Sequence, residues 1–362
     1  MRTVIPYKIL LAFIMLPLFV LASPKLDGKY TKKKVINKTY SVSSNATLKV
    51  NNSYGNIDII TWNENRIVFE VTITTSGNDE EKVQKKLDNI GVDFEEASNF
   101  VSAKTIFSKS KSSSWWSWGN NNNVNMKINY VIKIPITNHV DLNNDYGSIN
   151  LDKLEGVAKI SCDYGKITTK ELMADNNDIN FDYTKGCYFE YIKSGKINAD
   201  YSDFTVSKSQ KINITADYTN SKIEVAEDVN YNCDYGSIKI EKANNIIGKE
   251  NYLTTYIGDV YKNISLNSDY GSIKINRLTK NAENITIKAD YVGVKIGYDA
   301  THDFTFDIDL DYASLRDSDG LIFTKKIVES TSKHYIGYHG DANSKNTVNI
   351  VSDYGSVSLV KK

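Results

Sequence analysis

Histidine, proline and cysteine are scarce in this sequence of 362 residues, which holds 4 His, 4 Pro and 3 Cys. The histidines occupy unrelated positions, without a Cys/His spacing for a metal or a plausible Ser-His-Asp constellation. No glycine-rich phosphate loop follows a predicted strand. These absences argue against an ordinary enzyme, so we expect no catalytic residue, no metal ligand and no cofactor-binding residue.

An excess of charge of either sign is also lacking, because 44 Lys and Arg balance 44 Asp and Glu. A nucleic-acid partner is therefore not expected. The basic run Lys32-Lys33-Lys34 is short, and we interpret it as part of a flexible leader rather than a nucleic-acid patch.

A single apolar run is present, from Ile9 to Ala22, and its 14 residues fall short of the ~20 that a membrane-spanning helix needs. Arg2 and Lys8 precede the run, a pattern typical of a secretory signal peptide cleaved after Ala22. We therefore expect an exported protein without a membrane span, located at the cell surface, in the periplasm or in the medium.

Tyrosine, in contrast, is abundant, with 24 copies, and many of them follow an aspartate. The phrase Asp-Tyr or Asp-Tyr-Gly recurs every 17 to 21 residues from Tyr146 to Tyr312, and a degenerate copy around Tyr335 precedes the last one at Tyr354. Tyr256 fits the phrase at least as well as Tyr252 does, so both assignments stay open. The repeat tyrosines are Tyr54, Tyr146, Tyr164, Tyr183, Tyr201, Tyr218, Tyr235, Tyr252, Tyr270, Tyr291, Tyr312, Tyr335 and Tyr354.

The residues around each tyrosine alternate in the manner of strands. Ile212, Ile214 and Ala216 share a face with Tyr218, whereas Ile223 and Val225 fall on the other parity, so a corner must lie between. The glycine that often follows the tyrosine is expected there because a tight bend often needs a positive φ. A unit of this length predicts an all-β fold, a right-handed parallel β-helix solenoid. The alternative is an antiparallel barrel or sandwich with one hairpin per repeat.

In such a solenoid the tyrosines form a column, which their parity predicts to point inward. The preceding residues are ten Asp, one Asn and one Ser over twelve copies. These are side chains that bond back to the backbone at turns, which favours corner capping, and the alternative is a column that binds calcium. Outward lysines four residues after a tyrosine would offset part of the carboxylate repulsion, namely Lys222, Lys239, Lys274 and Lys295.

The cysteines are expected to be unpaired residues of the core. Cys162 and Cys233 hold equivalent positions four repeats apart, beyond disulfide reach, and Cys187 lies at a different corner.

The period breaks between the first and second copies. Strand-like alternation occurs at 66–75, 99–107 and 124–134, and a helix is predicted from Asp79 to Asn89, with Gly91 as its end. Together these elements predict a small αβ capping insertion near the N-terminus. The predicted organisation is a signal peptide (1–22), a leader (23–44), a first coil (45–62), the capping insertion (63–140) and a solenoid of Tyr-Gly coils (141–362).

A polar loop of the insertion carries Trp115, Trp116 and Trp118 among serines and asparagines. Three tryptophans there indicate a contact patch for a sugar or a protein, or else rings that fold back onto the cap.

Several phrases resemble the exported bacterial putative-adhesin family. They are Asn52-Ser53-Tyr54-Gly55-Asn56-Ile57, Ile134-Pro135 before the array, the Asp-Tyr coils from 145 to 312 and the closing copy from Val348 to Val357. The resemblance covers nearly all of the chain after the predicted signal peptide. It implies a β-helix of Tyr-Gly repeats with a capping insertion, and a role in adhesion.

The sequence thus favours a non-enzymatic, adhesin-like or scaffolding protein of the bacterial cell envelope, with a glycan or an envelope protein as partner. One alternative is a polysaccharide-acting β-helix enzyme, which would need clustered acids in long loops, whereas the loops here are short. A second alternative is a periplasmic partner of a membrane sensor.

Overall fold

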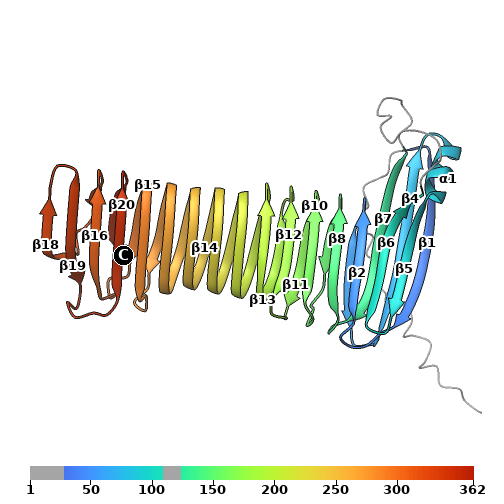
Figure 1. Ribbon diagram of the computed structural model, residues 1–362, viewed down its shortest axis with the longest axis horizontal. Coiled ribbons are helices and arrows are strands. Elements are labelled where there is room, and N and C mark those ends of the chain that lie inside the picture. The colour runs from blue at the N-terminus through green and yellow to red at the C-terminus, as the bar shows by residue number, and fades with distance from the viewer. Residues whose placement is uncertain (1–27, 109–123) are drawn as a thin grey trace, which may run out of the picture.

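The strands of this protein lie side by side in one long row, with a helix at one end and a hairpin at the other (Figure 1). The computed structural model describes residues 28–108 and 124–362, which form 21 strands of one sheet and one helix. The predicted all-β class is confirmed. The predicted signal peptide lies outside the described residues, and so do the three loop tryptophans Trp115, Trp116 and Trp118. Within the described ranges, no helix has the length and apolarity to cross a bilayer.

Strand β1 (Tyr30–Ser41) occupies the segment that was expected to be a flexible leader, so that prediction is wrong. It pairs antiparallel along its whole length with β4 (Arg66–Gly77). Lys34 of the basic run donates a hydrogen bond from Nζ to the carbonyl of Ile90 at 2.6 Å. A charged strand is acceptable here because β1 lies at an edge of the sheet, where lysines are common.

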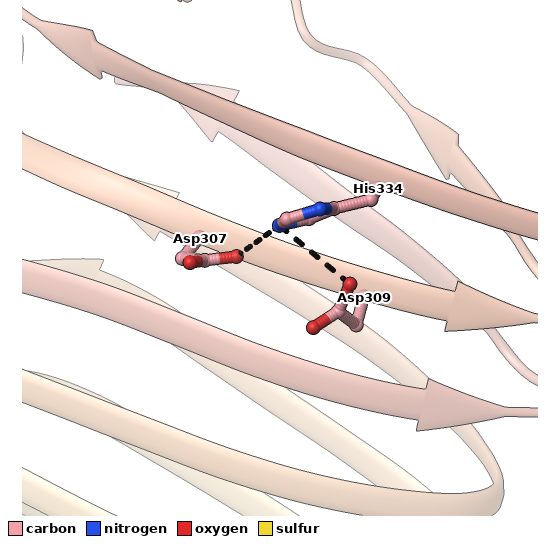
Figure 2. Close-up of side chains that lie close together, drawn as sticks. All are labelled: Asp307, Asp309 and His334. Atoms are coloured by element: carbon pink, nitrogen blue, oxygen red, sulfur yellow. Dashed lines mark hydrogen bonds and ion pairs between the residues drawn. The ribbon is translucent and has the colours of Figure 1, made fainter. Parts of the chain in front are cut away.

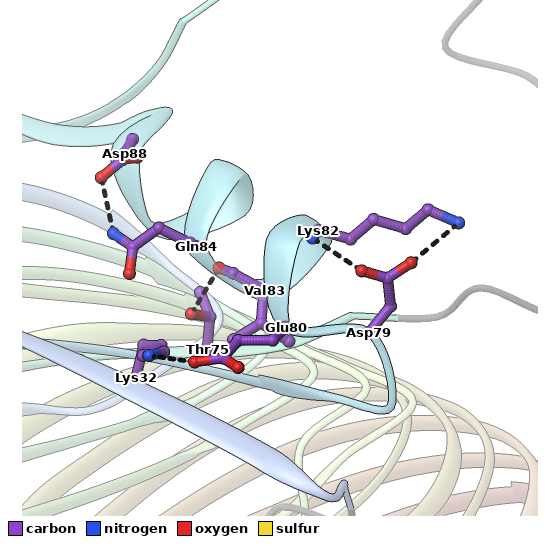
Figure 3. A network of polar contacts seen from close by, with 8 residues as sticks. All are labelled: Lys32, Thr75, Asp79, Glu80, Lys82, Val83, Gln84 and Asp88. Carbon is purple, nitrogen blue, oxygen red and sulfur yellow. Dashed lines mark hydrogen bonds and ion pairs between the residues drawn. The ribbon is translucent and has the colours of Figure 1, made fainter.

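The predicted helix is confirmed as α1 (Glu80–Asp88), which packs on β4 and β1 (Figure 3). The Asp79 carboxylate caps it by accepting from the Lys82 N–H at 3.2 Å. Thr75 of β4 donates its hydroxyl to the Val83 carbonyl at 3.0 Å. The helix ends before the predicted stop, Gly91, because Asn89 already provides the C-cap.

The remaining strands of the insertion extend the array at its N-terminal end. β6 (Phe100–Phe107) pairs in parallel with β2 (Thr47–Ser53), and β7 (Asn125–Pro135) pairs in parallel with β3 (Ile57–Trp62). The strands predicted around 99–107 and 124–134 are therefore confirmed. β5 (Ile90–Ala97), which pairs antiparallel with β6, was not predicted.

From β2 and β3 onward, strands pair in parallel with strands one repeat away. One ladder joins β2 to β8 (His139–Asp145), β10 (Ala158–Asp163) and β12 (Asn177–Asp182), and the other joins β3 to β9 (Ser148–Leu151), β11 (Lys166–Leu172) and β13 (Cys187–Asp200). β14 (Asp203–Leu278) and β15 (Asn284–Tyr298) continue the row. The repeats are thus not antiparallel hairpins. Antiparallel pairs occur at both ends, so the sheet as a whole is mixed.

The C-terminal strands do not follow chain order. β20 (Thr347–Asp353) inserts between β15 and β16 (Phe304–Asp311), and β21 (Ser356–Lys361) inserts between β15 and β17 (Ser314–Arg316). β19 (Ser332–His339) pairs antiparallel with β16 and with β18 (Ile322–Val328). Tyr335 lies on β19, where its ring contacts Phe323, so its predicted place in the tyrosine column is wrong.

Alternate side chains of the strands fill one continuous core. Ile212, Ile214 and Ala216 are buried as predicted, whereas Val225 is exposed. Cys162, Cys187 and Cys233 are buried and free, which confirms their predicted role as core residues. Burial raises the pKa of Cys162 and that of Cys233 to about 12.

The glycine after a repeat tyrosine is needed mainly for space, not for a positive φ as expected. A Cβ on Gly165 would lie 1.9 Å from the carbonyl oxygen of Gly147 in the preceding repeat. Of the glycines at this position, Gly236 does have a positive φ, of 136°. Where the position holds a hydroxyl residue, the hydroxyl serves the neighbouring repeat, as when Ser202 Oγ accepts from the Thr184 N–H at 3.0 Å.

The substitution Gly165→Ala should therefore lower the free energy of unfolding by about 1–3 kcal/mol, because the added methyl group forces two repeats apart. The matched control is Gly293→Ala, since Gly293 is exposed with no atom within 4 Å of its Cβ position. It should raise the free energy of unfolding by about 0.4–1 kcal/mol. Urea titrations measure both values, and an equal loss in the two variants would contradict the close-approach argument.

One acid is buried in the core of the array. Glu250 is 5% exposed, and its Oε2 accepts hydrogen bonds from the hydroxyl of Tyr231 at 3.0 Å and from the hydroxyl of Thr255. Burial raises the pKa of Glu250 and, together with the adjacent carboxylate, that of Tyr231. Gly248 makes room for this pair, because a Cβ there would lie 2.2 Å from Cζ of Tyr231.

The raised pKa of Glu250 predicts how the free energy of unfolding depends on pH. The folded protein holds the Glu250 proton more tightly than the unfolded chain, whose value is near 4.5, so this contribution to stability is complete below that pH and declines above it. Glu250→Gln does not titrate, and its free energy of unfolding relative to wild type should increase from pH 4 to pH 8, by about 1.4 kcal/mol for each pH unit by which the pKa of Glu250 in the folded protein exceeds that in the unfolded chain.

Urea titrations across this pH range measure the difference. Glu227→Gln, at an exposed position of the same strand, is the control and should leave the pH dependence unchanged. A constant offset between Glu250→Gln and wild type would refute the prediction.

Candidate functional site

Twelve tyrosines form a single exposed stack along one flank of the array. Their ring centroids are 4.6–5.3 Å apart and their planes lie within 9° of parallel. Each ring is 40–60% exposed. Inside the stack a neighbouring ring covers each ring face, so solvent meets the ring edges and the hydroxyl groups there. In spatial order the stack is Tyr54, Tyr146, Tyr164, Tyr183, Tyr201, Tyr218, Tyr235, Tyr252, Tyr270, Tyr291, Tyr354 and Tyr312.

The expectation that these rings point inward is wrong, and the backbone gives the reason. Each stacked tyrosine has a φ between 48° and 63°, in the left-handed region. This conformation interrupts the strand alternation, so the tyrosine does not continue the face of the buried residues before it. The corner of the repeat lies at the tyrosine itself, one residue earlier than predicted. The flip of parity in the sequence was the signal for this corner, but parity alone could not assign it to one residue.

The open choice between Tyr252 and Tyr256 is settled by the same geometry. Tyr252 stacks between Tyr235 and Tyr270 at 5.0 and 4.9 Å. Tyr256 lies elsewhere, with Lys239 and Lys274 above its ring at 5.3 and 5.6 Å.

The aspartates before the tyrosines link one repeat to the next. Asp163 Oδ1 accepts from the N–H of Asp182, and Asp182 Oδ1 accepts in turn from the N–H of Asp200, each at 3.2 Å. Asp200 Oδ1 accepts from the N–H of Asp217 at the same distance. The carboxylates thus bond to the backbone of the next repeat, whereas the predicted capping role was a bond back to the backbone of their own corner.

Three aspartates of the column hold their protons more tightly than isolated carboxyls do. Partial burial, with a smaller effect of the neighbouring carboxylates, raises the pKa values of Asp145, Asp182 and Asp217. Among the described residues, the one group of three acidic or histidine side chains close enough to share a metal ion lies outside this column. The geometry of the column therefore supplies no argument for calcium.

Two of the four lysines expected to offset the carboxylate repulsion pair with glutamates instead. Lys222 pairs with Glu224 at 2.8 Å and Lys239 pairs with Glu241 at 2.7 Å. Both glutamates lie on the strand that follows the tyrosine, so the lysines neutralise charges of their own strand. In the described structure these two lysines therefore form no ion pair with the aspartate column.

In the sequence, His334 takes the place of the aspartate in the degenerate copy and His339 follows it, which predicts two solvated corner residues. His339 is instead buried, with its ring 4.8 Å from Tyr298 and 5.6 Å from Phe304. His334 is partly exposed but paired, since its Nε2 lies 2.7 Å from Oδ1 of Asp307. The prediction of solvated corner residues is therefore wrong for both.

The stack predicts an end effect on stability. Tyr218 contacts two rings, whereas Tyr312 contacts only that of Tyr354 in the described structure. Glycine removes the strain of the left-handed backbone equally at both positions. Tyr218→Gly should therefore lower the free energy of unfolding by about 0.5–1.5 kcal/mol more than Tyr312→Gly does, because this is the stabilisation that one aromatic pair contributes. Equal losses in urea titrations would show that stacking adds no stability.

Comparisons with known proteins give only distant likenesses. No protein-family model matches the chain, and no curated protein matches it. Similar solved structures include a "putative cell adhesion protein" from Clostridium sporogenes, at 13% identity over 91% of this chain and 100% of that chain, with a TM-score of 0.18. A "putative adhesin" from Parabacteroides merdae has 11% identity over 90% and 96%, with a TM-score of 0.31. A "Putative lipid binding protein" from Parabacteroides distasonis has 10% identity over 90% and 96%, with a TM-score of 0.29. Likenesses at these TM-scores carry no argument about function.

Proposed function

We propose that the chain is an exported, non-enzymatic protein of the bacterial cell envelope that acts in adhesion or as a scaffold. The observation that carries this proposal is the stack of twelve exposed tyrosines, whose hydroxyls and edges repeat along one flank. A regular row of identical polar and aromatic groups suits binding, because a partner can contact the same group at many points. Such a row repeats one kind of group and does not form a catalytic centre.

We further propose that residues 141–362 wind as a right-handed parallel β-helix, with residues 45–62 as its first coil and residues 63–140 as its cap. Parallel ladders between strands one repeat apart support this architecture. The crossover rule supports the right-handed sense. The cap is supported by the pairing of β6 with β2, which covers a strand edge that would otherwise invite aggregation.

The stack suits a partner that is itself extended or repetitive, such as an envelope glycan or a surface protein. Ring faces are covered by neighbouring rings, so contact runs through phenol hydroxyls and edges and through the adjacent carboxylates. Each contact is weak alone, but equivalent sites about 5 Å apart on one rigid flank raise the overall affinity by multivalency. Trp115, Trp116 and Trp118 are proposed as a second contact patch.

The test is a binding screen of residues 23–362 against arrays of envelope glycans and proteins. A variant with Tyr183, Tyr201, Tyr218 and Tyr235 changed to Phe keeps the stacked rings and removes four hydroxyls, and it should lose at least about tenfold in affinity. The matched control changes four tyrosines of the same region outside the stack, Tyr188, Tyr191, Tyr256 and Tyr261, to Phe and should bind as wild type does. Replacement of the three tryptophans by Ala measures the second patch.

Two outcomes would overturn the proposal. One is wild-type binding by both tyrosine variants and by the tryptophan variant. The other is sugar release from a polysaccharide that depends on Asp200 or Asp217, tested with Asn at each position and with and without calcium. That result would favour a polysaccharide-acting enzyme.

A further inference from the structure

Three ligand-type side chains converge on the outer face of the C-terminal end of the array (Figure 2). His334 Nε2 lies 2.7 Å from Oδ1 of Asp307 and 3.6 Å from Oδ1 of Asp309. The ligand atoms of all three lie within 4.8 Å of one another. Their side chains are 26%, 50% and 58% exposed for His334, Asp307 and Asp309, so solvent reaches the group.

The backbone brings these residues together from two strands. Asp307 and Asp309 are two residues apart on β16 and therefore point to the same face. His334 lies on β19, directly opposite Asp309 in the antiparallel ladder. Both strands are regular and hydrogen-bonded along their length, so the three side chains start from fixed positions. Asp307 and His334 are 27 positions apart in the sequence, which explains why the sequence did not reveal the group.

The spacing of the donor atoms is that of ligands around one small ion. A metal with ligands at about 2.0–2.2 Å holds neighbouring donor atoms about 3.0–3.5 Å apart, and the distances of 2.7 and 3.6 Å bracket this range. Two carboxylates against one imidazole leave an excess of negative charge for a cation to neutralise. In the described part of the chain, the ion pairs of both aspartates are with His334.

We propose that Asp307, Asp309 and His334 bind one divalent transition-metal ion of the Zn²⁺ class. The imidazole nitrogen favours Zn²⁺, Ni²⁺ or Cu²⁺ over Ca²⁺ and Mg²⁺, which prefer oxygen ligands in larger number. Three protein ligands leave further positions for water or for a group from another molecule. Asn349, exposed on β20 in register with Asp307, offers an amide oxygen on the neighbouring strand.

The ion would tie β19 to β16 and so hold the hairpin of β18 and β19 on the end of the array. This hairpin is the last element of the row (Figure 1), and much of β18 is exposed. The inference is independent of the proposed role in adhesion, because it concerns the end of the array and uses none of the stacked tyrosines.

Isothermal titration of the full chain, carrying no histidine tag, with ZnCl₂ tests the proposal. The wild type should bind one ion, and a hundredfold excess over the Kd should raise its Tm by roughly 4 °C. His334→Gln and Asp309→Asn should each weaken binding by about tenfold or more, with unchanged circular dichroism. His139→Gln is the matched control, because His139 is the other histidine with a partly exposed side chain in the described structure, and it should bind as wild type does.

Three results would overturn the site. They are the absence of Zn²⁺ binding to the wild type, binding that His334→Gln leaves intact, and binding of CaCl₂ or MgCl₂ as tight as that of ZnCl₂. The first would leave the three residues as side chains that contact one another without a bound ion. If His334→Gln alters the circular dichroism, the absorption spectrum of Co²⁺ bound to the wild type decides, since a nitrogen ligand shifts it from that of the hydrated ion.

Discussion

The stack of aromatic rings holds each repeat in a backbone conformation that tyrosine otherwise avoids. A left-handed conformation costs about 1–2 kcal/mol for a residue with a side chain, and each of the stacked tyrosines adopts it. One ring pair per repeat contributes about 0.5–1.5 kcal/mol beyond the burial of ring surface. The two quantities are of similar size, so a ring without neighbours would not maintain the corner. The repeats are therefore stabilised together rather than singly.

The corner also demands close contact between the backbones of successive repeats. Gly147 and Gly165 satisfy it by having no side chain, while Thr184, Ser202 and Thr219 satisfy it with hydroxyl groups that bond to the neighbouring repeat. The aspartate column adds bonds from carboxylate to backbone at the same corner. Tyrosine, its predecessor and its successor thus each serve the contact between repeats, and this explains why the three positions recur as one phrase.

The strands at the two ends of the row pair differently from those in the middle, because no further repeat lies beyond them in the described structure. At the N-terminal end, β6 and β7 supply parallel partners for β2 and β3, and β1, β4 and β5 then pair antiparallel. At the C-terminal end, β20 enters between β15 and β16, where its buried Val348 and Ile350 meet Ile285 and Ile287 on one side and Phe306 and Ile308 on the other. The hairpin of β18 and β19 then closes the row.

The sequence by itself determined the repeat length, the strand parity, the core cysteines and the helix near Asp79, because these depend on local periodicity and local capping. It also located ten of the stacked tyrosines in their order, from Tyr54 to Tyr312, and left the choice between Tyr252 and Tyr256 open. Only the tertiary structure decided that the rings face outward, since a left-handed backbone at one residue reverses a side chain without changing the spacing of the pattern. It likewise decided that Tyr354 lies between Tyr291 and Tyr312, and that Asp307 and His334 meet. Both depend on which strands pair across long stretches of chain, and local periodicity carries no information about that choice.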